Sequence, residues 1–197
     1  MNVLEENKIK ESQKRVKEYI TENRITTKGS KEYVEFFLKN ADNSLDSARA
    51  LFVLSTDQNK KQSLGFTEFN GLLWVVNASY YSMFYITRAL LENEGIKIKI
   101  DQSIHAVIFD CLVHFFYSTG KLQKNLIEDY ADAQENASEL LGKQKADELV
   151  YDYFHEKGKR GTFTYSMGEN IILTKAKTSL ERAQNYNKAL KMILKKL

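Results

Sequence analysis

A short basic and aromatic segment near the C-terminal end of the chain holds the residues best suited to contact a phosphate. Lys159 and Arg160 are followed, five positions after the arginine, by Tyr165. A guanidinium binds a phosphate through two parallel hydrogen bonds, and an aromatic ring stacks on a base. These three residues therefore predict a nucleotide- or RNA-binding site. The alternative is structural: Arg160 pairs with an acidic residue, and Tyr165 packs against the last helix.

Catalysis at this segment would need a group that exchanges a proton near neutral pH. Histidine suits that task, whereas tyrosine, with an ordinary pKa of about 10, suits it poorly. His155 lies five residues before Arg160 and could approach the same site from the other side. The candidates for catalysis are thus Arg160, Tyr165 and His155, and binding without turnover is the first expectation.

Metal sites and cofactor sites are not expected. The three histidines, His105, His114 and His155, are far apart in the sequence, and Cys111 is the only cysteine. A single cysteine cannot form an internal disulfide or join a multi-cysteine metal site, so we expect it to be a small buried residue. The sequence also lacks a glycine-rich phosphate loop. We therefore expect no metal and no cofactor.

Composition favours a helical protein without membrane-spanning segments. The chain has 197 residues, no proline and a formal charge of +3, with 29 Lys and Arg against 26 Asp and Glu. Helix interiors exclude proline, and so mild a charge does not by itself indicate nucleic acid. No apolar run reaches the roughly 18 residues of a membrane helix, and the N-terminus has no signal-peptide core. We expect a cytoplasmic location and no membrane partner.

Apolar residues recur at spacings of three and four along most of the chain, as they do on one face of a helix. The expected fold is an all-α domain whose core consists of four long helices near residues 31–55, 71–94, 102–118 and 169–196. Extra helices within 121–155, divided at Gly142, are expected between the last two. The helix at 71–94 is apolar on most sides and should be central, with Tyr80 and Tyr81 in the core.

The remaining segments are expected to be connections. Residues 56–69 and 158–168 are polar and rich in loop-forming residues, so both should be loops. The alternating segment at 96–100 should be an extended connector, because no second strand is apparent. Ser30 is the expected N-cap of the helix that follows it.

The first helix, within residues 4–22, has only a thin apolar stripe. It is therefore either a weakly docked appendage or a surface for a partner. The expected division is an N-terminal helical appendage over residues 1–29 and a helical bundle domain over residues 30–197. The lysines that crowd the end of the last helix are interpreted as a solvated face, with a nucleic-acid surface as the alternative.

One segment resembles the central helix of the HEPN (higher eukaryotes and prokaryotes nucleotide-binding) superfamily. It is Asn77-Ala-Ser-Tyr-Tyr-Ser-Met-Phe-Tyr-Ile-Thr-Arg-Ala-Leu-Leu-Glu-Asn-Glu-Gly95. As in that family, a histidine opens the next helix (His105), an arginine precedes the last core helix (Arg160), and that helix carries a small and an aromatic residue (Ala183 and Tyr186). The resemblance covers residues 31–197.

The HEPN resemblance implies an antiparallel up-and-down helical bundle that is commonly a dimer. Active members are metal-independent ribonucleases with an Arg-x4–6-His motif, and many are encoded beside a small nucleotidyltransferase as toxin–antitoxin pairs. Here Tyr165, Ser166 and Met167 occupy the positions that would supply the histidine. The resemblance therefore implies a module that binds a nucleotide, RNA or a nucleotidyltransferase partner. The alternative is a toxin-like ribonuclease with an unusual acid–base residue, His155 or Tyr165.

The same resemblance implies a homodimer that brings two copies of the segment from Arg160 to Tyr165 together. The sequence adds a physical reason. The last helix has a heptad-like seam and further apolar residues, Leu173, Leu180 and Leu194, that one bundle would not cover. Exposed apolar surface of this kind usually marks an interface.

Overall fold

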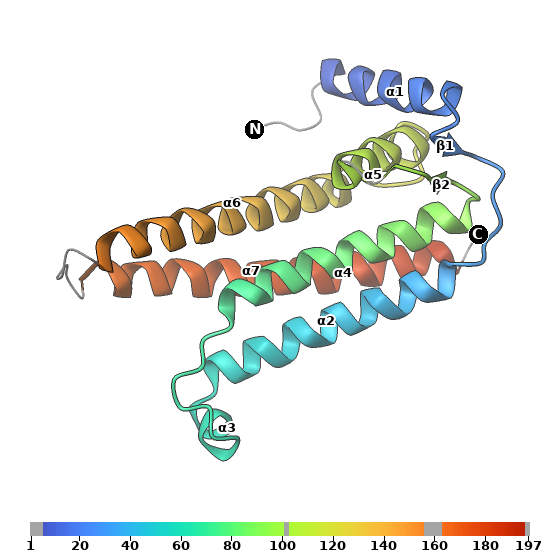
Figure 1. Ribbon diagram of the computed structural model, residues 1–197. Helices are drawn as coiled ribbons and strands as arrows, with labels where there is room; N and C mark the ends of the chain where they lie inside the picture. The colour runs from blue at the N-terminus through green and yellow to red at the C-terminus, as the bar shows by residue number, and fades with distance from the viewer. Residues whose placement is uncertain (1–5, 101–102, 156–162, 196–197) are drawn as a thin grey trace.

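The computed structural model describes residues 6–100, 103–155 and 163–195, and the side chains of residues 6–100, 103–140 and 171–195. The predicted all-α bundle is confirmed: helices dominate, and the described residues contain one two-stranded sheet. The bundle consists of four long helices (Figure 1), which are α2 Val34–Thr56, α4 Leu72–Asn93, α6 Lys124–His155 and α7 Phe163–Leu194. The expectation of a long core helix near 102–118 was wrong: residues 104–117 form two short helical segments, and α6, expected as extra helices, is the fourth long helix. The shorter elements are α1 Glu6–Thr21, β1 Ile25–Thr26, α3 Gln58–Ser63, β2 Lys97–Ile98, α5 Ile104–Leu112 and the π-helix η1 Val113–Tyr117.

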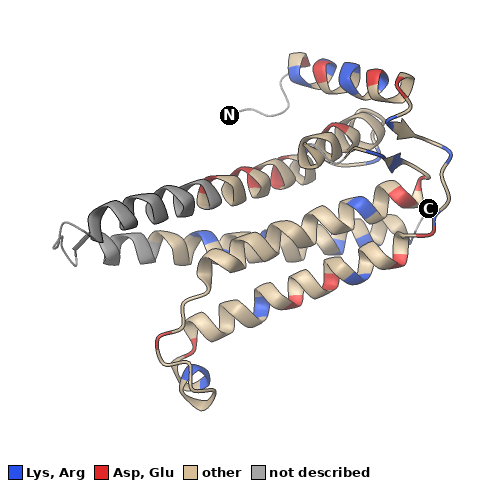
Figure 2. Cartoon of the chain, viewed as in Figure 1, with Lys and Arg blue, Asp and Glu red and all other residues tan. Residues whose placement is uncertain are grey.

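Helix α4 is the centre of the bundle, as its sequence predicted. It packs against α2, α7, α6 and α5, and most of its residues are buried. Figure 2 shows few charged residues along α4, whereas charges of both signs alternate along α1. Gly95 follows α4 with φ +74°, and a Cβ there would lie 3.1 Å from the carbonyl oxygen of Gly29. This glycine is needed both for the left-handed turn and for the close approach of the two chain segments.

Helices form in three places where breaks were predicted. The expected loop at 56–69 contains α3, α6 continues through Gly142, and α7 begins at Phe163 although residues up to 168 were expected to be a loop. A glycine inside a helix costs only about 1 kcal/mol relative to alanine. Extending a helix that has already formed adds one hydrogen bond for each residue fixed. A single glycine is therefore too weak a signal to end a helix of 32 residues.

The expected connector at 96–100 contains a strand that does have a partner, so that expectation was wrong. β2 pairs antiparallel with β1, with Ile25 opposite Ile98 and Thr26 opposite Lys97. Each strand is two residues long. No alternation of polar and apolar residues can be recognised over so short a length. The pairing ties the end of α1 to the segment between α4 and α5.

The expected helix cap at Ser30 is also wrong. α2 begins after Tyr33, which makes no side-chain capping hydrogen bond. The hydroxyl of Ser30 instead accepts a hydrogen bond of 2.8 Å from the ammonium group of Lys97. Lys97 also pairs with Glu32 at 2.9 Å and with the buried Glu92 at 3.5 Å. Ser30 therefore helps to hold this lysine near the two carboxylates.

Buried side chains confirm the predicted roles of several core residues. Cys111 is fully buried, and burial raises the pKa of its thiol to about 12. The predicted stripe of α7 faces the core at Ala176, Ala183, Tyr186 and Leu190. Of the three further apolar residues of that helix, Leu173 is exposed as expected. Leu180 is buried and Leu194 packs against the core, so the expectation that one bundle leaves all three uncovered was wrong.

Two fully buried tyrosines differ in how their hydroxyls are satisfied. The Tyr186 hydroxyl forms a hydrogen bond of 2.8 Å with that of Thr87, whereas no partner of acceptable geometry meets the Tyr130 hydroxyl. We expect Tyr186→Phe to lower the free energy of unfolding by about 1 kcal/mol, because the Thr87 hydroxyl loses its bond to Tyr186. Tyr130→Phe should not lower it, because the buried Tyr130 hydroxyl has the Tyr80 hydroxyl beside it but forms no hydrogen bond of good geometry. Urea denaturation of both variants measures the two changes, and a loss of stability in both would contradict this account.

Candidate functional site

The residues first considered for phosphate binding lie outside the side chains that the structure describes. Lys159 and Arg160 fall in the gap between α6 and α7. His155 is the last residue of α6, and Tyr165 lies in the first turn of α7. The structure gives the backbone positions of His155 and Tyr165 on these two neighbouring helices, and it does not describe their side chains. The candidate site that can be built from side chains lies elsewhere, on α2, α4 and α5.

A continuous line of aromatic rings runs across these three helices, partly exposed and partly buried, with Phe37 as its buried member. We call it the aromatic strip; its members are Phe36 and Phe37 of α2, Tyr81 and Tyr85 of α4, and His105 of α5. Successive ring centroids are 5.4 Å apart for Phe36–Phe37, 6.5 Å for Phe37–Tyr85, 6.2 Å for Tyr85–Tyr81 and 6.0 Å for Tyr81–His105. Phe36 is 57% exposed and Tyr81 is 40% exposed. The strip therefore presents aromatic surface to solvent.

His105 is held at one end of the aromatic strip by rings from α4. Its Nδ1 forms a hydrogen bond of 2.8 Å with the hydroxyl of Tyr80, and its ring centroid lies 4.7 Å from that of Phe84. Burial lowers the pKa of His105, so the imidazole is neutral at pH 7. Burial also raises the pKa of Tyr80, which stays protonated. When Tyr80 donates to Nδ1, the proton of the imidazole is on Nε2, which can then donate to a ligand.

Helix α4 carries a second arrangement that overlaps the aromatic strip. Trp74, Ala78, Tyr81, Tyr85 and Arg88 follow one another at spacings of four, three, four and three residues. Trp74 is 55% exposed, and the other four are exposed or half-buried, while the residues between them are mostly buried. We call this line the α4 seam. Its spacing is the one with which a helix meets another helix along a heptad seam.

Arg88 is the only charged member of the α4 seam. Its guanidinium carbon lies 4.6 Å from the ring centroid of Phe37, close enough for a cation–π contact. Burial lowers the pKa of Arg88, and the nearby Glu92 opposes that effect. Among the side chains that the structure describes, no carboxylate lies within ion-pair distance of Arg88. The arginine is therefore held by aromatic surface and keeps hydrogen-bonding capacity for a ligand or partner.

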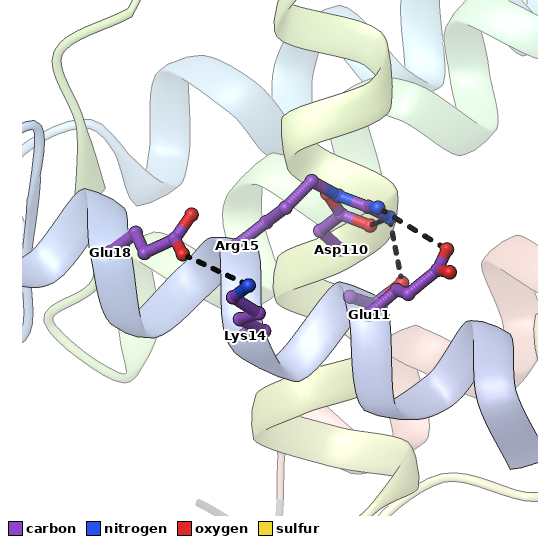
Figure 3. A network of polar contacts seen from close by, with 6 residues as sticks. Glu11, Lys14, Arg15, Glu18 and Asp110 are labelled. Atoms are coloured by element: carbon purple, nitrogen blue, oxygen red, sulfur yellow. Dashed lines mark hydrogen bonds and ion pairs between the residues drawn. The ribbon is translucent and has the colours of Figure 1, made fainter.

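A polar contact between α1 and α5 has a structural role. Figure 3 shows Arg15 of α1 reaching Asp110 of α5. Nε of Arg15 donates to Oδ2 of Asp110 at 2.7 Å, and Nη2 donates to Oδ1 at 2.8 Å. The Asp110 side chain is 5% exposed. Both groups are satisfied by each other, so this pair fastens α1 to the bundle.

Groups that could hold a metal ion are not found among the described residues. No three His, Cys, Asp or Glu side chains in that part of the chain come close enough to share an ion. None of the helices, over the residues that the structure describes, has a stretch long and apolar enough to cross a membrane.

The aromatic strip and the α4 seam were not recognised from the sequence. Tyr80 is buried as predicted, but the expectation that Tyr81 lies in the core was wrong. α4 has apolar residues on all sides, so periodicity alone could not show which side lacks a covering helix. The spacing from Trp74 to Arg88 was present in the sequence and is the signal that could have indicated the seam.

Comparison of the chain with models of protein families, with curated proteins and with solved structures gave no match.

Proposed function

We propose that this chain is a binding module of the HEPN type, which holds a nucleotide or RNA, or a nucleotidyltransferase partner, without turning it over. The observation that carries the proposal is the aromatic strip, because exposed rings on a rigid helical scaffold are typical of surfaces that bind other molecules. Phe36 and Tyr81 expose their rings although buried positions lie beside them on the same helices. A binding role accounts for that exposure.

Two further features support the HEPN type. Tyr80 and His105, on which the resemblance partly rests, are joined by a hydrogen bond of 2.8 Å between α4 and α5. Tyr186 of α7 is fully buried, with its ring centroid 5.9 Å from that of Tyr130. Residues far apart in the sequence thus lie in one cluster. The antiparallel pairing of long helices agrees with the bundle that the resemblance implies.

For the ligand, we propose a phosphate-bearing one bound at Lys159, Arg160 and Tyr165. Arginine holds a phosphate through two hydrogen bonds, and a tyrosine ring stacks on a base of any sequence. Such a site would bind single-stranded RNA with little sequence preference. The affinity should fall as the salt concentration rises, because the phosphate contacts release counterions.

The test is binding of a fluorescently labelled single-stranded RNA, followed by anisotropy in the presence of EDTA. We expect saturable binding that Arg160→Ala weakens at least tenfold and that leaves the RNA intact. Arg49→Ala is the matched control, because Arg49 is an exposed arginine of α2 that pairs with Asp46. Absence of binding to RNA and to free nucleotides would contradict the proposed ligand.

RNA cleavage in the same assay would favour the alternative, a metal-independent ribonuclease. Cleavage should then be abolished by Arg160→Ala. His155→Gln and Tyr165→Phe would show which of the two side chains acts as the acid–base group. Cleavage that survives Arg160→Ala would point to a contaminating nuclease.

A further inference from the structure

We propose that a second copy of the chain docks on the α4 seam, with the two α4 helices antiparallel and related by a two-fold axis near Tyr81. Because the second copy would cover Phe36 and Tyr81, this inference assigns the exposed aromatic surface to the dimer, whereas the ligand site proposed at Lys159, Arg160 and Tyr165 involves other residues. The inference also differs from the dimer that the sequence suggested, in which the segments at Arg160 would meet. The evidence is the spacing of the seam, the match between its two ends, and the exposure of its residues.

The spacing of the α4 seam suits a helix as its partner. Residues that repeat every three and four positions form the line along which two helices pack side by side. From Trp74 to Arg88 the seam spans 14 residues, or about 21 Å at the helical rise of about 1.5 Å for each residue. The small side chain of Ala78 allows close approach between two helix axes.

The two ends of the seam are complementary to each other. Trp74 lies seven residues before Tyr81, and Arg88 lies seven residues after it. In an antiparallel pair centred on Tyr81, the Trp74 ring of each copy therefore meets the Arg88 guanidinium of the other. Tryptophan is the best aromatic partner for a guanidinium. A two-fold axis forms this contact twice.

The middle of the seam is complementary in size. Ala78 and Tyr85 lie three residues before and four after Tyr81, so the alanine of one copy lies one residue away from the position opposite the tyrosine of the other. Large side chains then fill the space that small ones leave, as in packed helix interfaces. Phe36, which is 57% exposed at the edge of the same surface, would extend the buried area beyond the two helices.

The half-buried guanidinium of Arg88 also favours a second copy over a purely apolar partner. Its guanidinium is half-buried against Phe37, and the described residues supply no carboxylate as an ion-pair partner. An apolar partner would bury this charge further without compensation, which is costly. A second copy brings a tryptophan to each of the two arginines. A foreign helix would need an aromatic or acidic residue at the matching position.

The test uses the fact that Trp74 is the only tryptophan of the chain. Sedimentation velocity of the full chain at rising micromolar concentrations should show a shift from the 22.8 kDa monomer to a dimer. Tryptophan emission should shift to shorter wavelength over the same concentration range, because dimerisation removes Trp74 from water. Ala78→Arg, which puts a long charged side chain in the middle of the seam, should raise the dimer dissociation constant at least tenfold.

Three further variants make the result specific. Phe66→Ala removes a phenylalanine that is 50% exposed between α3 and α4 and is not a member of the seam, and it should leave the dimer unchanged. Trp74→Ala changes a side chain that is 55% exposed, so folding should be kept, and circular dichroism confirms the helix content. Trp74→Ala and Arg88→Leu should each weaken the dimer, and the double variant should weaken it by less than the product of the two effects.

A chain that stays monomeric at all concentrations, or a dimer that tolerates both Ala78→Arg and Trp74→Ala, would overturn the proposal. The outcome is separate from that of the RNA assay. If Ala78→Arg abolishes the dimer but still binds RNA, the seam is supported as the dimer interface. The same result would show that the ligand site does not need the dimer. A dimer in Arg160→Ala without RNA binding would show that the two surfaces are independent.

Discussion

Replacing Leu90 with alanine is expected to lower the free energy of unfolding by about 3 kcal/mol. Leu90 lies on α4, the helix that contacts all the other long helices, and its side chain is fully buried. The substitution removes apolar surface from the core and leaves a cavity that the surrounding helices cannot fill completely. Guanidinium denaturation followed by circular dichroism measures the change.

A leucine outside the core provides the control for this variant. Leu64 follows α3 and is 59% exposed, so Leu64→Ala makes the same chemical change without forming a cavity. We expect its unfolding midpoint to match that of the wild-type chain. If the two variants were destabilised equally, α4 would not be the centre of the cooperative core.

Replacing Arg15 with alanine is expected to lower the free energy of unfolding by about 2 kcal/mol. The variant leaves the Asp110 carboxylate, whose side chain is 5% exposed, without the two charge-assisted hydrogen bonds that Arg15 supplies. Because the Arg15 side chain is 44% exposed, water can reach the site, and the loss should fall short of that for a fully buried pair. Limited proteolysis should also cut near α1 sooner, since the pair fastens that helix.

Lys14→Ala is the matched control on the same helix. Lys14 is 78% exposed and pairs with Glu18 at only 3.9 Å, as Figure 3 shows beside Arg15. Exposed pairs of this kind contribute little to stability. Lys14→Ala should therefore be indistinguishable from wild type in both assays. Equal behaviour of the two variants would mean that the Asp110 contact does not hold α1.

The long helices could be predicted from the sequence because their apolar spacing extends over several turns. The predictions at 31–55 and 71–94 differ by a few residues at most from α2 and α4. The short elements could not be predicted, because their patterns extend over too few residues. α3 has six residues and each strand has two, so neither contains enough repeats for a period to be recognised. The break expected at Gly142 was wrong because one residue cannot outweigh the helical preference of its neighbours.

The candidate site was harder to predict than the fold. Periodicity shows that a residue is apolar but not whether a neighbouring helix covers it, and Tyr81 was placed in the core for that reason. Burial depends on how α2 and α5 are arranged around α4, which follows from contacts between distant parts of the chain. The hydrogen bond between Tyr80 and His105 joins residues 25 positions apart and could not be inferred from spacing on one helix.

The attachment of α1 has a consequence for the order in which the chain can assemble. Its contacts join Arg15 to Asp110, 95 positions later, and Gln13 to Ser118, 105 positions later. α2 and α4, in contrast, are separated only by residues 57–71, which contain α3, and can pair as soon as both exist. During synthesis α1 therefore waits for its binding surface until the residues of α5 and η1, 95 to 105 positions later, have been made.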